Sequence, residues 1–501
     1  MTLFPCALLL CTALPLRAEE TTSESQTRAY WNDGFRIEHT DLENDTEYRF
    51  RFRTSMEFRY TYAITDGNTA GYDLASTGAR PGNEDHHSAF NMRRLRFYAD
   101  GTAPSRDWKY FLHIQLEPNT GVNAHDGYVQ WQRFEQLRVQ FGRMKVPAFS
   151  LEFWQSGFKL DGTDRTIFTG DSEADKDLFG NRTYDFPSGN ARLRVGNQRL
   201  GNGFATGGLT LYRSQGLNLN GAIDWLGRKQ LLAYWAGLYN GRDTRGFSGP
   251  DRDMLVTLRL GLNFLPGSDP EGPLGPQGLA NYTLQGDHGF NTYPLGAVLL
   301  SGFWDRQKTS TLYLPDPDEP GFMGRGSDPH EIENYGFSGT LLLRYYGFSL
   351  DWEFAWEEFI QDEGGPRSEV WDRWATRLNL GQFVVRGEWE LTAKFAYVVR
   401  LDGAGLRNSL TSGLGLVNRQ GGWVAEESLQ EYRLGVNWYL EGYNQMIAAD
   451  AALLHAEFRA ISHNEALGVL GLATASTVGL FPNTVDPEND LRLRIMYQYR
   501  F

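Results

Sequence analysis

Residues 45–62 read DTEYRFRFRTSMEFRYTY, and from Tyr48 onward two kinds of side chain alternate. Apart from Thr54, the even positions hold aromatic residues and one methionine, whereas the odd positions hold Arg49, Arg51, Arg53 and other polar residues. A period of two is the side-chain period of an extended strand. This stretch therefore predicts a strand with one aromatic face and one charged face.

The same alternation recurs at the end of the chain, where residues 491–501 read LRLRIMYQYRF. Five further segments repeat it: 108–117, 254–264, 348–357, 389–400 and 432–440. In each segment we assign the apolar positions to lipid and the charged or polar positions to a wet interior. A half-buried strand of a soluble sheet also alternates, with its charges outside. An apolar leader and a terminal Phe501 favour the first interpretation, an all-β fold that forms a transmembrane antiparallel β-barrel.

Residues 1–18 are predicted to be a secretory signal peptide, which leaves residues 19–501 for the barrel. An apolar run from Ala7 to Leu16 precedes Ala18, the expected cleavage position, and two glutamates follow. No Lys or Arg precedes the apolar run, and Leu16 is large for its place before the cut. A frayed N-terminal strand and a wrongly assigned start are the alternatives.

Composition narrows the class of protein. Both cysteines lie in the leader, so the mature chain has no thiol for a disulfide, a metal or a nucleophile. With one leader arginine removed, 47 basic and 62 acidic residues give a net charge of −15, which argues against a nucleic-acid partner. The 56 glycines and 14% aromatic residues suit many turns and interfacial aromatic belts. The uncharged stretch 466–481 is too short for a membrane helix, so we interpret it as a loop.

Turn residues separate the predicted strands. The segments 65–87, 312–331 and 401–427 are rich in Gly, Pro, Asp and Asn, and we expect them to be long outer loops. Residues 240–243 read NGRD and predict a hairpin connection before a strand that begins near Arg252. Residues 266–270 read PGSDP and are expected to end that strand.

Several motifs in order resemble one family. They are FNMRRLRFYADGTAPSRDWKY at 90–110, DGYVQWQRFEQLRVQFGRMKVPAFSL at 126–151, WAGLYNG at 235–241, LRLG at 258–261 and YRLGVNWYL at 432–440. Together they resemble the phosphate-selective porins of the O and P type, over most of the mature chain except about 180–230 and 266–295. The resemblance implies a homotrimer of 16-stranded barrels in the outer membrane of a Gram-negative bacterium. Each pore would be narrowed by an infolded third loop. We expect outer-membrane lipid, lipopolysaccharide, the barrel-assembly machinery and small anions as partners.

The resemblance also implies which residues act on the solute. It places Arg93 and Arg94 near the constriction, Lys145 at the start of the infolded loop and Arg165 within it. Neighbouring strand residues face opposite ways, so Arg93 and Arg94 both point inward only if a bulge intervenes or one lies at the rim. With Leu95 and Phe97 outward, Arg94 and Arg96 are the inward pair. Each arginine offers planar, permanently charged donors to an oxyanion, but each could also be a solvated wall residue without selectivity.

On the opening strand, Arg49, Arg51 and Arg53, with Arg59, could form a basic ladder that guides anions down the lumen. Where the family has Gly-Gly-Arg, residues 53–55 read Arg-Thr-Ser, a departure that leaves strict phosphate selectivity open. The inward carboxylates Asp351, Glu353 and Glu357 would repel anions unless arginines pair with them.

We therefore expect a passive outer-membrane channel for small anions, with phosphate or a related oxyanion as a candidate solute. The alternatives are a general diffusion porin, a porin for small organic solutes, or a non-conducting barrel such as an adhesin, a receptor or a lipid hydrolase.

We expect no enzyme, no metal and no cofactor. His86-His87 beside Asp85 could bind a metal, but adjacent loop histidines are usually solvated. The acidic residues Glu117, Asp161, Asp164 and those between Asp171 and Asp177 could bind calcium or bridge lipopolysaccharide, and otherwise supply loop polarity. Glu388 and Glu390 superficially resemble a glycosidase pair, but no nucleophile motif accompanies them.

Overall fold

The computed structural model describes residues 25–41, 46–65, 85–117, 121–155, 159–169, 213–240, 254–266, 285–309, 330–362, 369–401, 416–417, 423–460 and 488–501. Within these residues the chain is almost entirely strand. The strands are β1 (Ser25–Trp31), β2 (Phe35–Asp41), β3 (Thr46–Thr65), β4 (Asp85–Thr102), β5 (Trp108–Glu117), β6 (Gly121–Trp131), β7 (Arg138–Lys145), β8 (Arg213–Trp225), β9 (Arg228–Tyr239), β10 (Leu255–Pro266), β11 (Leu295–Thr309), β12 (His330–Tyr345), β13 (Phe348–Asp362), β14 (Glu369–Val385), β15 (Trp389–Leu401), β16 (Leu416–Val417), β17 (Trp423–Tyr439), β18 (Gln445–Ala460) and β19 (Glu488–Arg500). The one helix of this part is α1 (Leu151–Trp154), and no helix in it is both long and apolar enough to span a bilayer.

In the described part of the chain, sixteen of these strands, β3–β15 and β17–β19, form one closed antiparallel barrel. Each strand pairs with the next in sequence, β15 pairs with β17, and β19 pairs with β3 from Ser55 to Thr65. Closure satisfies the backbone donors and acceptors that an open sheet edge would leave exposed to lipid. The predicted all-β, antiparallel barrel of about 16 strands is confirmed.

Side-chain burial follows the alternation predicted from the sequence. On β10, Leu258 is 48% exposed on the outer face, whereas its neighbour Arg259 is 1% exposed. The same contrast recurs on β19 between Ile495, which is exposed, and Arg494, which is buried. Charged residues therefore point into the barrel and apolar residues point out of it, the reverse of a soluble sheet.

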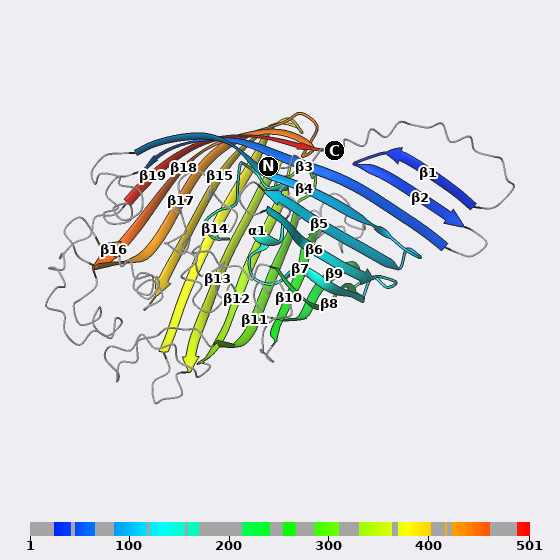
Figure 1. Ribbon diagram of the computed structural model, residues 1–501, viewed down its shortest axis with the longest axis horizontal. Helices are drawn as coiled ribbons and strands as arrows, with labels where there is room; N and C mark the ends of the chain where they lie inside the picture. The colour runs from blue at the N-terminus through cyan, green and yellow to red at the C-terminus, as the bar shows by residue number, and fades with distance from the viewer. Residues whose placement is uncertain are drawn as a thin grey trace, which may run out of the picture.

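The N-terminal section of β3 extends beyond the barrel seam, a feature that the sequence pattern does not predict. Residues Thr46–Phe52 pair with β2, and β1 and β2 form a hairpin beside them (Figure 1). The hairpin turn contains Gly34, whose φ of +106° suits glycine and few other residues. The strand that closes the barrel with β19 is thus the third in the chain.

At one end of the barrel, every connection except the one between β10 and β11 is short. Short turns join strands at 103–107, 132–137, 226–227, 346–347, 386–388 and 440–444. At the other end, strands β4, β12 and β17 begin inside the predicted ranges of the long loops, at Asp85, His330 and Trp423. The strand predicted near Arg252 begins at Leu255, and β10 ends at Pro266 as expected. The leader, the remaining loop residues and the segment 466–481 lie outside the described residues.

Candidate functional site

The connection between β7 and β8 turns into the barrel, as the resemblance implies. Its described part, 146–155 and 159–169, is almost wholly buried. Apolar residues of this infolded segment, including Phe149, Ile167 and Phe168, pack into one cluster with residues of the strands. Ser150 caps α1 by accepting a hydrogen bond from the Phe153 backbone N–H.

One carboxylate, Asp164, ties the infolded segment to β3 and β4. It pairs with Arg59 at 2.9 Å, Arg93 at 3.3 Å and Arg94 at 3.4 Å. Arg94 also pairs with Glu57 at 2.8 Å. A β-bulge lets adjacent arginines reach the same carboxylate. In the register of β3 and β4, Glu57 lies opposite Arg94 and Phe58 lies opposite Met92, so Arg93 is the extra residue of the bulge. The bulge turns both Arg93 and Arg94 inward, which is one of the two alternatives that the sequence left open.

The opposite wall holds the backbone of the infolded segment. The backbone N–H groups of Gly162, Thr163 and Ile167 donate to Asn437 Oδ1 (3.0 Å), Asp450 Oδ2 (3.1 Å) and Glu431 Oε2 (2.8 Å), respectively. Asp161 Oδ2 accepts a bond from the Asn379 side chain at 3.4 Å. The interpretation of Asp161 and Asp164 as loop polarity is wrong, because both are buried and hydrogen-bonded inside the barrel.

A second segment enters from the end with short turns. The backbone N–H of Gln285 donates to the Lys159 carbonyl at 3.1 Å, and its Oε1 accepts the Asp161 N–H at 2.9 Å. His288 lies against the rings of Tyr439 and Tyr443, with centroids 4.4 and 4.2 Å away. Nothing in the sequence pattern indicated this segment, which meets the infolded segment beside β15 and β17.

Two of the three inward carboxylates predicted on β13 form ion pairs. Asp351 forms an ion pair with Arg344 at 2.6 Å, and Glu353 with Arg377 at 2.7 Å. Gln155 of the infolded segment donates to Asp351 at 3.3 Å. Asp351 and Glu353 therefore help to dock the infolded segment, and for these two the predicted pairing with arginine is present.

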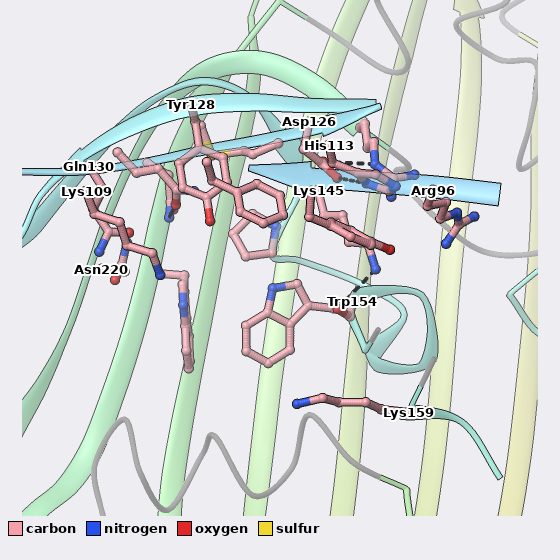
Figure 2. A pocket seen from close by; sticks show the side chains of 18 of the residues that line it. Arg96, Lys109, His113, Asp126, Tyr128, Gln130, Lys145, Trp154, Lys159 and Asn220 are labelled. Atoms are coloured by element: carbon pink, nitrogen blue, oxygen red, sulfur yellow. Dashed lines mark hydrogen bonds and ion pairs between the residues drawn. The ribbon is translucent and has the colours of Figure 1, made fainter. Parts of the chain in front are cut away.

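Beside the infolded segment, the wall formed by β3–β9 borders a cavity of about 520 Å³ (Figure 2). Its lining contains one carboxylate, Asp126, and seven basic residues: Arg53, Arg96, Lys109, Lys145, Lys159, Arg213 and Arg500. Asp126 is compensated, because it pairs with Arg213 and with His113, each at 2.9 Å. The cavity thus has a strong excess of positive charge although the whole chain is acidic.

The cations of the cavity differ in their partners. Arg53 pairs with Asp100 at 2.7 Å, and Lys145 donates to the carbonyls of Phe153 and Gln155, both at 2.8 Å. Among the described residues, the ammonium groups of Lys109 and Lys159 make no hydrogen bond and no ion pair. Burial, and then the nearby Arg500 and Arg53, lower the pKa of Lys159 from its usual range.

Aromatic rings share the lining with the cations. Tyr98, Phe111 and Tyr128 stand on the neighbouring strands β4, β5 and β6, and the ring centroids of Phe111 and Tyr128 are 5.2 Å apart. Trp154 of α1 meets Trp235 of β9 at 5.5 Å. Sequence reasoning missed these residues, although Phe111 carried a signal because it interrupts the polar positions of its strand.

The predicted site residues fall into three groups. Arg53, Arg96 and Lys145 line the cavity. Arg93, Arg94 and Arg165 hold the infolded segment; Arg165 Nε donates to the Glu152 carbonyl at 3.2 Å. Arg49 and Arg51 lie where β3 pairs with β2, outside the cavity lining, and pair with Glu47 and Asp100. The action of all eight residues on a solute stays a prediction.

The structure gives no support to the residue groups that the sequence analysis considered as metal, calcium or glycosidase sites. No cluster of three or more His, Cys, Asp or Glu that could hold a metal occurs among the described residues. Glu388 lies in the turn before β15, whereas Glu390 is buried and accepts a bond from the Tyr439 hydroxyl at 2.6 Å. The side chains of His86, His87 and Glu117, and residues 171–177, lie outside what the structure describes.

A closed barrel with an apolar exterior, a charged interior and an infolded segment defines the class of outer-membrane channels. Residues 65–167 match the family of phosphate-selective porins O and P, which confirms the predicted resemblance over the segment from the end of β3 to the infolded segment. The family match and the barrel support a non-enzymatic channel and point to a Gram-negative outer membrane.

Comparison with known proteins adds three distant structures. They are the outer membrane channel DcaP of Acinetobacter baumannii (10% identity, TM-score 0.46, covering 91% of this chain and 97% of that one), an anion-selective porin from Comamonas acidovorans (11%, 0.46, 90% and 100%) and OprB of Pseudomonas putida (10%, 0.48, 92% and 95%). No curated protein gives a significant match. At this level of similarity the fold assignment rests on the strand order of the chain itself.

Proposed function

We propose that this protein is a passive outer-membrane channel that favours small anions over cations. The observation that carries the proposal is the cavity between the infolded segment and the β3–β9 wall, where seven basic residues face one compensated carboxylate. Selectivity depends on the few charged groups at the narrow part of a pore, so the net charge of −15 does not oppose it.

Two cations give the proposal its chemistry. Lys109 from the wall and Lys159 from the infolded segment face the same cavity (Figure 2). Neither ammonium group forms an ion pair with a described residue. A hydrated anion that enters can therefore exchange part of its hydration for these donors. Phosphate is one candidate solute, and general anion passage is the second candidate.

The remaining features follow from the sequence patterns and, for the homotrimer, from the family resemblance. We include a cleaved signal peptide at 1–18, a homotrimer, contact with lipopolysaccharide and insertion by the barrel-assembly machinery. The homotrimer is tested by the mass of the purified complex in detergent.

Planar-bilayer recording of the folded protein tests the function. We expect stepwise conductance in KCl and a fall in chloride current when phosphate is added. A folded protein without conductance steps would end the channel proposal. Chloride current that phosphate leaves unchanged would retain the anion channel and remove phosphate as its solute.

A further inference from the structure

The aromatic residues that line the basic cavity indicate which class of anion it favours. This inference rests on the proposed function. Inward positions of a water-filled barrel are normally polar, yet Phe111 lies inward between Lys109 and His113 on β5. Tyr98 and Tyr128 flank it on the adjacent strands, with ring centroids 6.2 and 5.2 Å from that of Phe111. This side of the cavity therefore presents a continuous aromatic surface.

A second aromatic surface faces the cavity from the infolded segment. Trp154 lies at the end of α1, and its ring is held edge-on by Trp235 of β9, with an interplanar angle of 74°. Figure 2 shows Trp154 between Lys159 on one side and the group of Lys109 and Tyr128 on the other. Ring surfaces and the ammonium groups of Lys109 and Lys159, which have no ion-pair partner among the described residues, thus lie around the same cavity.

A bare inorganic oxyanion gains from the ammonium groups but not from the rings. It has no apolar surface to bury, and the faces of aromatic rings carry negative partial charge, which an anion avoids. A flat organic anion makes two favourable interactions, because its apolar body can stack on a ring while its charged end contacts a lysine. A cavity of about 520 Å³ is also in the range that holds small organic ligands.

We propose that this cavity is a transit site for small organic anions with a planar apolar body, of the aromatic carboxylate class. The carboxylate is held by Lys109 or Lys159, and the ring lies against Phe111 or Trp154. The test uses benzoate and acetate, two monocarboxylates that differ in the ring. Each is added to the channel in KCl, and the concentration that halves the chloride current is measured.

We expect benzoate to block at a concentration roughly three- to tenfold lower than acetate, the range of one aromatic contact. Phe111→Ser should raise the half-blocking concentration of benzoate several-fold and leave that of acetate unchanged. Phe134→Ser is the matched control, because Phe134 is an exposed ring outside the cavity. Trp154→Leu provides a second variant on the opposite surface, and stepwise conductance in KCl alone shows that each variant has formed a pore.

Equal block by benzoate and acetate would overturn the inference, as would a Phe111→Ser effect of the same size on both anions. These failures are distinct from failure of the proposed function, which would appear as absent conductance or a preference for cations before any organic anion is added.

Discussion

Asp164 shows what single residues do in this barrel interior. Its carboxylate pairs with Arg59, Arg93 and Arg94, which come from two adjacent strands. All four side chains are buried, where an ion pair attracts strongly and an uncompensated charge is expensive. The arginines nearest the predicted constriction therefore first serve to position the infolded segment.

Asp164→Asn should weaken that attachment. Removing one partner of a buried ion pair typically costs about 3–5 kcal/mol, so we expect the infolded segment to detach more often from β3 and β4. Single-channel recording should show larger and noisier conductance than the wild type. Asp107→Asn, in an exposed turn, is the control. Unchanged conductance and noise in Asp164→Asn would contradict this role.

At the scale of elements, the two inward segments divide the barrel interior. The infolded segment and residues 285–291 dock along β11–β18, and Asp164 also ties the infolded segment to β3 and β4. The rest of the β3–β9 wall borders the cavity. Strand parity was predictable from alternation alone. The docking contacts were not, because pairs such as Ile167 with Glu431 depend on the register of every intervening strand. Likewise, the sequence pattern of one strand does not show which strands lie near it. It therefore could not show that Arg213 and Lys109 line the same cavity.

Asp161, on the infolded segment, should make docking depend on pH. Burial raises its pKa to about 6, while Lys394 opposes that shift and Asp351 adds to it. A raised carboxyl pKa means that the folded state holds the proton more tightly, so stability falls as pH rises from 4 through 6.

Asp161→Asn, which is neutral at every pH, should therefore stabilise the protein at pH 8, by up to about 3 kcal/mol, and have little effect at pH 3. Denaturant midpoints in detergent at the two pH values measure this difference. The same shift at both pH values would show that the proton on Asp161 is not the cause.

At the scale of the whole molecule, the C-terminus completes the seam. The Phe501 N–H donates to the Thr54 carbonyl at 3.0 Å, and the Thr54 N–H donates to the Phe501 carbonyl at 2.7 Å. The ring of Phe501 stacks on Trp31 of the N-terminal hairpin at 6.4 Å. The terminal aromatic thus extends the β3–β19 pairing by one residue and joins it to β1, a contact that sequence alternation did not predict.

Deleting Phe501 should reduce the amount of barrel in the outer membrane. The deletion removes two seam hydrogen bonds and the terminal aromatic of an amphipathic last strand, which we expect the assembly machinery to recognise. The comparison is deletion of Asp318, a residue of the predicted loop 312–331. Equal outer-membrane yields from the two deletions would refute this role of the C-terminus.

The central claim is that the cavity beside β3–β9 sets the charge preference of the pore. The most direct measurement is the reversal potential across a KCl gradient for the wild type, for Lys109→Glu/Lys159→Glu and for Arg133→Glu, whose side chain lies in an exposed turn. For the wild type and Arg133→Glu, we predict a reversal potential close to the equilibrium potential of chloride, which indicates a preference for anions. In the double variant we predict that this preference is lost or reversed. A cation preference in the wild type, or an unchanged anion preference in the double variant, would contradict the account.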